Sequence, residues 1–285
     1  MKLDGRREST NVQDRRGMSS GGKLGLGGII IVGVLTLLFG GDLTDVFNNV
    51  TSSGGFATEQ TSTEFTAEEQ ALASFSKKIL AGTEDVWTAY FEKNGLGQYR
   101  NPTLVLYTGS TQSGCGTGSA SMGPFYCSAD QCLYIDLSVF SSMKSQLGAD
   151  GDFAYAYVIA HEVGHHVQNL LGTLSQAHQK MSSVSQAEAN RISVRLELQA
   201  DFYAGVWAHH DDAMYSSIEP GDIDEAIRCA SVIGDDYLQK KAQGYAVEES
   251  FTHGTAAQRK KWLSLGIQTG DIRKGNTFAL SDREL

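Results

Sequence analysis

The chain has 285 residues, of which 41% are hydrophobic and 20% charged, a composition typical of a folded protein and not of a disordered one. Its formal net charge is −10 at pH 7, and the first 23 residues carry six of the 23 basic side chains but only three of the 33 acidic ones. The remainder is therefore strongly acidic, which disfavours nucleic acid as a partner.

An uncharged, apolar segment follows the basic N-terminal residues. Residues 24–39 read LGLGGIIIVGVLTLLF, and as a helix they would extend about 24 Å, somewhat less than the roughly 30 Å of a bilayer core. No small-x-small cleavage site follows them, and the cations precede them. The sequence therefore predicts an uncleaved transmembrane signal anchor at 24–41, with residues 1–23 as a basic cytoplasmic tail. The alternative is a buried core helix.

A segment rich in Gly, Ser, Thr and Asn at 42–65 is typical of a flexible linker. After it, Thr66 and Glu69 form a capping box that predicts a helix to about residue 94. Strands are predicted at 103–107 and 133–137 on either side of a Gly-rich loop at 109–124, and helices at about 152–171, 186–210, 222–243 and 255–264. The expected fold is one mainly helical α+β domain at 66–285 with a small sheet, preceded by a single transmembrane helix.

The motif HEVGHH at 161–166 lies within the first of these long helices. His161 and His165 are one helical turn apart, so both imidazoles can reach one tetrahedral zinc ion, while Glu162 points beside the open coordination position. The alternative is a pair of hydrogen-bonded core histidines.

A third ligand is expected from the motif ELQAD, which begins 32 residues after His165. A zinc site with two histidines needs one more protein ligand, and Glu197 can supply a carboxylate oxygen. Asp201, one turn further on, is placed to hold a ligand imidazole by its other ring nitrogen. The apolar neighbours of both carboxylates favour a metal site over a solvated helix face.

These residues resemble known families. HExxH followed by ExxAD resembles the Glu-zincin arrangement of zinc metallopeptidases, including the HtpX-type membrane proteases. More closely, nearly the whole chain resembles the bacterial neutral zinc metallopeptidase family typified by YpfJ, in DGRREST at 4–10, GPFYC at 123–127, LYIDLSVF at 133–140, AHEVGHHVQNLLG at 160–172, ELQADFYAGVWAH at 197–209 and SFTHGTAAQRKKWL at 250–263. The resemblance implies a zincin-like domain with one Zn²⁺ per chain, held by His161, His165 and Glu197, and a catalytic Glu162.

Four cysteines allow three pairings. Cys115 and Cys127, twelve residues apart around the Gly-rich loop, are the preferred disulfide and suit an oxidising compartment. The chain has Phe202 where the resemblance suggests a cysteine, which would leave Cys229 without its usual partner and Cys132 as a replacement.

The predicted function is a membrane-anchored zinc endopeptidase, in which a zinc-activated water attacks the peptide bond and Glu162 acts as general base. The resemblance to HtpX-type enzymes makes His253 a candidate oxyanion stabiliser, although Gly254 replaces their proline; the alternative is a plain loop residue. The strand near 133–136 is the expected edge for pairing with a peptide substrate, and Asp235 is expected to be surface charge.

The predicted location is the bacterial cytoplasmic (inner) membrane, with a single pass and the catalytic domain on the periplasmic side. The expected partners are a peptide or protein substrate and the membrane, through residues 24–41. Two alternative functions stay open: a non-catalytic, zinc-stabilised extracytoplasmic module that binds a protein or cell-wall partner, and a non-peptide zinc hydrolase.

Overall fold

The computed structural model describes residues 1–17 and 65–285. Helix α3 (Ala67–Asn94) begins at the predicted capping box, because Thr66 Oγ1 accepts from the Glu69 N–H and the Glu69 side chain accepts from the Thr66 N–H. It ends at Gly95, whose φ of 64° lies in the left-handed region that glycine adopts without strain. Local sequence signals therefore account for both ends of this helix.

A four-stranded sheet with the order β1-β2-β6-β5 lies against the helices. Its strands are β1 (Val12–Asp14), β2 (Thr103–Tyr107), β6 (Cys132–Asp136) and β5 (Phe125–Cys127), and only β5 runs antiparallel to its neighbour. Alternate side chains of β2 and β6 divide between two clusters: Leu104 and Ile135 pack in the main core, and Val105 and Tyr134 pack in a second cluster. Both faces are covered, which explains why all five residues of β6 are buried.

The predicted Gly-rich loop at 109–124 contains a hairpin of β3 (Ser110–Ser113) and β4 (Gly116–Ser119). These strands consist mainly of Ser, Thr and Gly, so the sequence carries no hydrophobic alternation to reveal them. The hairpin packs on the second cluster, because a Cβ at Gly118 would lie 2.5 Å from the ring of Phe125. The loop prediction is therefore wrong for the residues of these two strands.

Helices make up most of the remainder: α4 (Ser138–Ser142), the π-helical turn η2 (Met143–Leu147), α5 (Asp152–Leu170), α6 (Thr173–Met181), α7 (Gln186–Tyr215), α8 (Asp222–Val232), α9 (Asp235–Gln243) and α10 (Ala256–Thr269). The helix predicted at 222–243 is in fact α8 and α9, separated near Gly234. A Cβ at Gly234 would lie 2.3 Å from the backbone nitrogen of Ala256, so the chain breaks where two backbones touch.

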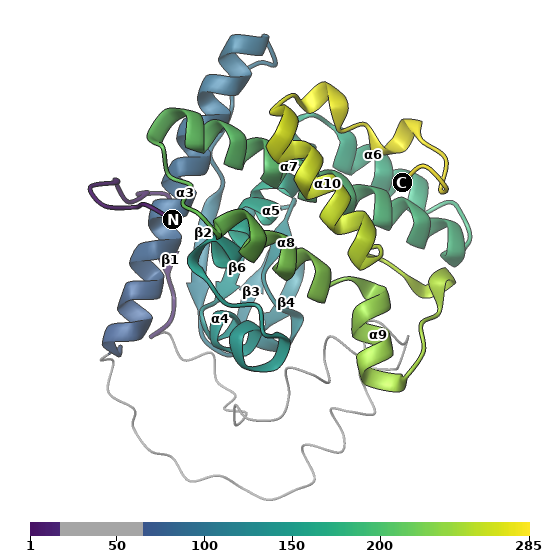
Figure 1. Cartoon of the computed structure of the whole chain (residues 1–285), viewed down its shortest axis with the longest axis horizontal. Coiled ribbons are helices and arrows are strands. Elements are labelled where there is room, and N and C mark those ends of the chain that lie inside the picture. The colour runs from purple at the N-terminus through teal and green to yellow at the C-terminus, as the bar shows by residue number, and fades with distance from the viewer. Residues whose placement is uncertain (18–64) are drawn as a thin grey trace, which may run out of the picture.

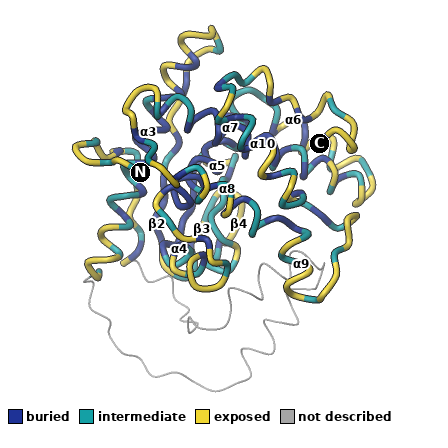
Figure 2. Tube along the Cα trace, viewed as in Figure 1, coloured by how far each residue is buried: buried dark blue, intermediate teal, exposed yellow. Residues whose placement is uncertain are grey.

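Helices α5 and α7 form the centre of the molecule, and Figure 2 shows their traces largely buried. Helix α10 packs closely on α7, because a Cβ at Gly266 would lie 2.1 Å from the carbonyl oxygen of Phe202. This backbone contact holds α10 against the part of α7 that carries Asp201.

The N-terminal residues are part of the domain and not a separate tail. Strand β1 pairs in parallel with β2, and Figure 1 shows the N-terminal residues, in purple, beside α3. Arg6 forms two hydrogen bonds of 2.7 and 3.1 Å with the buried carboxylate of Asp211 on α7. Ser9 and Asn11 both donate to Glu84 on α3. Residues 1–17 are therefore anchored to the sheet and to two helices.

The predicted fold class is right in its α+β part and wrong in placing a transmembrane helix before a separate domain. Within residues 1–17 and 65–285, no helix is both long enough and apolar enough to span a bilayer. The predicted anchor at 24–41 lies outside the described residues. The pairing of β1 with β2 supplies the physical correction: one membrane crossing between them would place the two strands on opposite sides of the bilayer.

Cys115 and Cys127 form the predicted disulfide, which links the β3–β4 hairpin to β5. Cys132 and Cys229 are free and buried, so the suggested replacement pair does not form. Cys132 lies opposite Cys127 in the β5–β6 register, whereas Cys229 lies in the main core. Burial raises the pKa of the Cys229 thiol to about 12, which is typical of an unreactive core cysteine.

Candidate metal centre

Two central helices bring the predicted metal ligands together. His161 and His165 lie on α5, and Glu197 lies on α7. The helices approach closely because Gly164, between the two histidines, has no side chain: a Cβ there would lie 2.8 Å from the carbonyl oxygen of Ala200. A larger residue at this position would push Glu197 away from the histidines.

The three side chains converge on one point. The Glu197 carboxylate lies 3.1 Å from Nε2 of His161 and 3.4 Å from Nε2 of His165. One nitrogen or oxygen from each residue lies within 4.8 Å of the other two. Two imidazole nitrogens and one carboxylate oxygen are a donor set that suits zinc.

Asp201 holds His161 from the side away from this point. Its carboxylate can only accept, so the contact of 2.8 Å with Nδ1 of His161 places a proton on that nitrogen and makes Nε2, which faces Glu197, the nitrogen available to a metal. Tyr157 donates to the same carboxylate oxygen at 2.6 Å. Such a bond fixes the tautomer of a ligand histidine and increases its basicity.

Arg259 on α10 neutralises Asp201, with contacts of 2.8 and 2.9 Å to its two oxygens. Burial would raise the pKa of Asp201, but the charge and hydrogen bonds of Arg259 lower it to about 2. Burial likewise opposes protonation of His161, yet hydrogen bonds with Asp201 and Glu197 raise its pKa to about 10. A metal ion at this point would therefore have to displace a proton from His161.

Glu162 is a buried carboxylate without a hydrogen-bond partner in the part of the chain that the structure describes. Glu162 is only 8% exposed and lies next to His161 on α5. Burial raises the pKa of this carboxyl group, partly offset by the charges of His161 and His165. Burying a charged carboxylate without a hydrogen-bond partner costs free energy of folding, unless a bound group such as a metal ion or substrate lies beside it.

His253 lies in the loop before α10 and is nearly half exposed. The loop is held by Asp235, whose carboxylate accepts from the backbone N–H groups of Thr252, His253 and Gly254. The same carboxylate lies 3.3 Å from Nδ1 of His253. Although desolvation opposes it, hydrogen bonding to Asp235 and the charge of Glu197 raise the pKa of His253.

Three of these residues have roles that sequence reasoning missed. Asp235 is completely buried and organises the His253 loop, so its prediction as surface charge is wrong. Tyr157 and Arg259 lie 44 and 58 residues from Asp201 in the chain, and no local spacing signals either contact. Gly234, just before Asp235, is the sequence signal for this arrangement, because a glycine can mark a close contact between two backbone segments.

The expected edge strand is also misplaced. Strand β6 lies between β2 and β5, so it has no free edge. In the described sheet the outer strand on this side is β5, which is tied to α5 because Tyr126 contacts Nδ1 of His166 at 2.9 Å. His166 is buried packing: its Nε2 donates to the carbonyl oxygen of Arg100, and burial lowers its pKa to about 4.

The mainly helical α+β domain and its converging His/His/Glu donor set, of which His161 is buried, define a candidate zinc protein. The chain belongs to the family described as "Putative neutral zinc metallopeptidase", which it matches over residues 1–278. It is 47% identical to "Uncharacterized protein YpfJ" of Escherichia coli (strain K12), over 99% of this chain and all of that protein. It is 42% identical to "Uncharacterized protein Rv2575" of Mycobacterium tuberculosis, over 65% of this chain and 64% of that protein. No solved structure matches the chain.

Proposed function

We propose that the chain is a zinc-dependent peptidase that hydrolyses peptide bonds, with Glu162 as general base. The observation that carries the proposal is Glu162 itself: a buried carboxylate with no hydrogen-bond partner among the described residues, next to the three converging donors. A metal site that only stabilises the fold has no use for such a carboxylate, whereas a hydrolytic site needs one.

His161, His165 and Glu197 would hold the zinc ion. When bound there, zinc supplies Lewis-acid polarisation and lowers the pKa of water. Glu162 takes a proton from the attacking water at its carboxylate and delivers it to the nitrogen of the leaving amine. The raised pKa of Glu162 suits a group that must both accept and return a proton near neutral pH.

The substrate would lie along β5. This strand has an unpaired edge in the described sheet and is joined to α5 through Tyr126 and His166. An extended peptide can add to such an edge through main-chain hydrogen bonds. The Cys115–Cys127 disulfide at the end of β5 supports an oxidising compartment for the domain.

Metal removal tests the proposal directly. We expect the purified full chain to contain one zinc ion and to cleave members of a peptide library, to lose cleavage on treatment with a chelator, and to regain it when zinc is restored. Metal content by mass spectrometry and fragment analysis of the library provide the measurement. Zinc binding without cleavage of any peptide would instead favour a non-catalytic zinc module.

His253 is the proposed hydrogen-bond donor to the oxyanion that forms during attack. Asp235 occupies its Nδ1, so Nε2 is the nitrogen left to face a substrate. Replacing His253 by Ala should lower kcat by about 10²–10³-fold, as for other oxyanion donors, and leave the zinc content unchanged. His210→Ala makes a matched control that should keep its activity. His210 lies near the end of α7 and contacts the carbonyl oxygen of Gly270, which follows α10. Equal activity of the two variants would remove this role from His253.

A further inference from the structure

Two buried glutamine side chains hold His165 from behind. Nδ1 of His165 lies 2.9 Å from Oε1 of Gln168, a residue with no exposed surface. Nε2 of Gln168 lies 2.8 Å from the carbonyl oxygen of Leu196 and 3.1 Å from Oε1 of Gln199. Nε2 of Gln199 in turn lies 2.9 Å from the carbonyl oxygen of Gly275.

The direction of every hydrogen bond in this chain is determined. Backbone carbonyl oxygens can only accept, so the amide nitrogen of Gln168 must face Leu196 and that of Gln199 must face Gly275. Oε1 of Gln168 is then the atom turned toward His165, whose Nδ1 must be the donor. Nε2 of His165, the nitrogen that faces Glu197, is thereby the one left to bind a metal.

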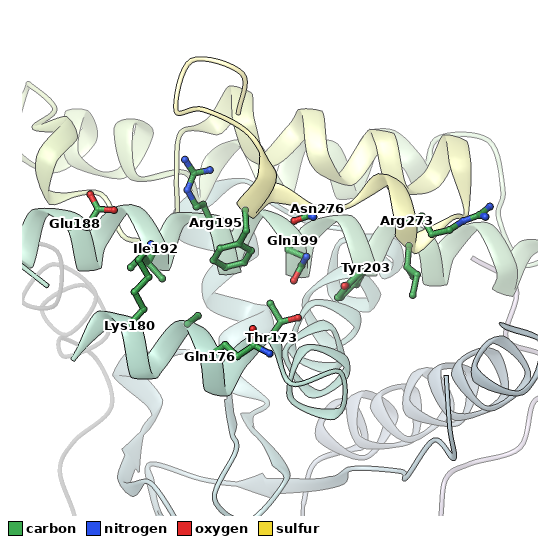
Figure 3. A pocket seen from close by; sticks show the side chains of 13 residues that line it. Thr173, Gln176, Lys180, Glu188, Ile192, Arg195, Gln199, Tyr203, Arg273 and Asn276 are labelled. Atoms are coloured by element: carbon green, nitrogen blue, oxygen red, sulfur yellow. The ribbon is translucent and has the colours of Figure 1, made fainter. Parts of the chain in front are cut away.

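The far end of the chain is fixed by packing. A Cβ at Gly275 would lie 2.3 Å from the ring of Phe202, so this glycine sits directly on α7 and its carbonyl oxygen cannot shift freely. Gln199 also lines a cavity of about 540 Å³ between α6, α7 and residues 272–278, where Figure 3 shows it pointing from α7. The glutamines thus connect His165 to the segment that forms one wall of this cavity.

The two ligand histidines are held by different chemistry. His161 donates to the carboxylate of Asp201, which Arg259 neutralises. His165 donates to the neutral amide of Gln168, which carries no charge and therefore needs no counter-ion. An amide supplies both an acceptor for the imidazole and a donor for the next group, so it can pass a fixed direction from one residue to another, which a carboxylate cannot do.

We propose that Gln168 and Gln199 form a directional amide relay that fixes the tautomer and orientation of His165 and anchors it to the backbone at Gly275. The proposal rests on the zinc site proposed above. Both glutamines are positioning residues, because neither reaches the point where the three metal donors converge. Gln199 acts on His165 only through Gln168.

Zinc affinity of the full chain, measured by competition with a chromogenic chelator, tests the relay without any substrate. Replacing Gln168 by Met should weaken zinc binding about 10–100-fold, as for other residues that orient ligand histidines. Replacing Gln199 by Met should weaken it less, because the contact between Gln168 and His165 remains. The double variant should bind zinc no more weakly than Gln168→Met alone, since the two residues act in series.

A matched control comes from Gln239, which is equally buried but bonds to Val247 and Ser250 and touches no metal ligand. Gln239→Met should lower the unfolding temperature and leave zinc affinity unchanged. In the zinc-loaded wild type, the Nδ1 proton of His165 should give a slowly exchanging NMR signal, and Gln168→Met should lose it. If Gln168→Met does not fold, Gln199→Met provides the test. Weaker zinc binding than in the wild type supports the relay, and equal zinc affinity overturns it.

The outcomes separate the two proposals. Zinc binding by the wild type with equal affinity in Gln168→Met, or independent and multiplying losses in the double variant, would overturn the relay and leave the metal site intact. A wild-type chain that binds no zinc would overturn the metal site and the relay with it. Zinc binding without peptidase activity would contradict only the proposed reaction.

Discussion

Replacing Glu162 by Gln is expected to lower kcat by about 10²–10⁴-fold, the usual contribution of a positioned general base. The amide has nearly the same shape as the carboxylate, but it cannot take a proton from water or return one to the leaving amine. Zinc content should stay at the wild-type level, because Glu162 is not one of the three converging donors. Steady-state kinetics on a peptide identified from the library provides the measurement.

The same variant has an expected effect on stability that distinguishes a catalytic from a structural carboxylate. Glu162 is buried without a hydrogen-bond partner in the described residues, so loss of its charge should leave the free energy of unfolding unchanged or increase it. Glu188→Gln, which removes an exposed carboxylate on α7 that bonds to Arg191, makes a matched control and should keep full activity. A Glu162→Gln protein that unfolds more easily or loses zinc would show that this carboxylate is structural.

Replacing Arg259 by Met should destabilise the fold by about 3–5 kcal/mol, the range found when one partner of a buried ion pair is removed. Met has a similar length and can fill the space, but it removes the main counter-charge of the Asp201 carboxylate, a residue with no exposed surface. The loss should extend to zinc binding, because Asp201 also orients His161. Urea unfolding of the metal-free and zinc-loaded proteins measures both effects.

Arg273→Met makes the matched control for this prediction. Arg273 also makes close contacts with both oxygens of an aspartate, Asp271, but its side chain is 85% exposed. Exposed pairs contribute little to stability, so the control should unfold almost as the wild type does. If both variants unfold alike, the stability of the site does not depend on the pairing of Asp201 with Arg259.

The metal donors could be predicted from the sequence because their geometry is local. A spacing of four residues on a helix places His161 beside His165, and the same spacing places Asp201 one turn after Glu197. The capping box of Thr66 and Glu69 predicted the start of α3 for the same reason, since it needs only two residues three positions apart. The Cys115–Cys127 pair was accessible from its short separation around a Gly-rich loop.

The N-terminal residues show where this local reasoning fails. An excess of cations before an apolar segment predicted a tail outside the domain, but two of those cations pair with carboxylates far along the chain: Arg6 with Asp211, and Arg7 with Glu84. Strand β1 has only three residues and gains its stability from β2, about 90 residues away. Charge counts alone cannot distinguish such docked cations from solvated ones.

The sequence by itself thus determined which residues can hold a metal and act as a base, because one helical turn sets the distances that matter. Only the tertiary structure decided how these residues are oriented: Asp201 and Arg259 hold His161, Gln168 and Gln199 hold His165, and Asp235 holds His253. Each of these arrangements includes a contact between side chains or backbone groups on different elements, brought together where glycines let helices touch. Periodicity and spacing carry no information about such contacts, because they arise from packing and not from the local path of the chain.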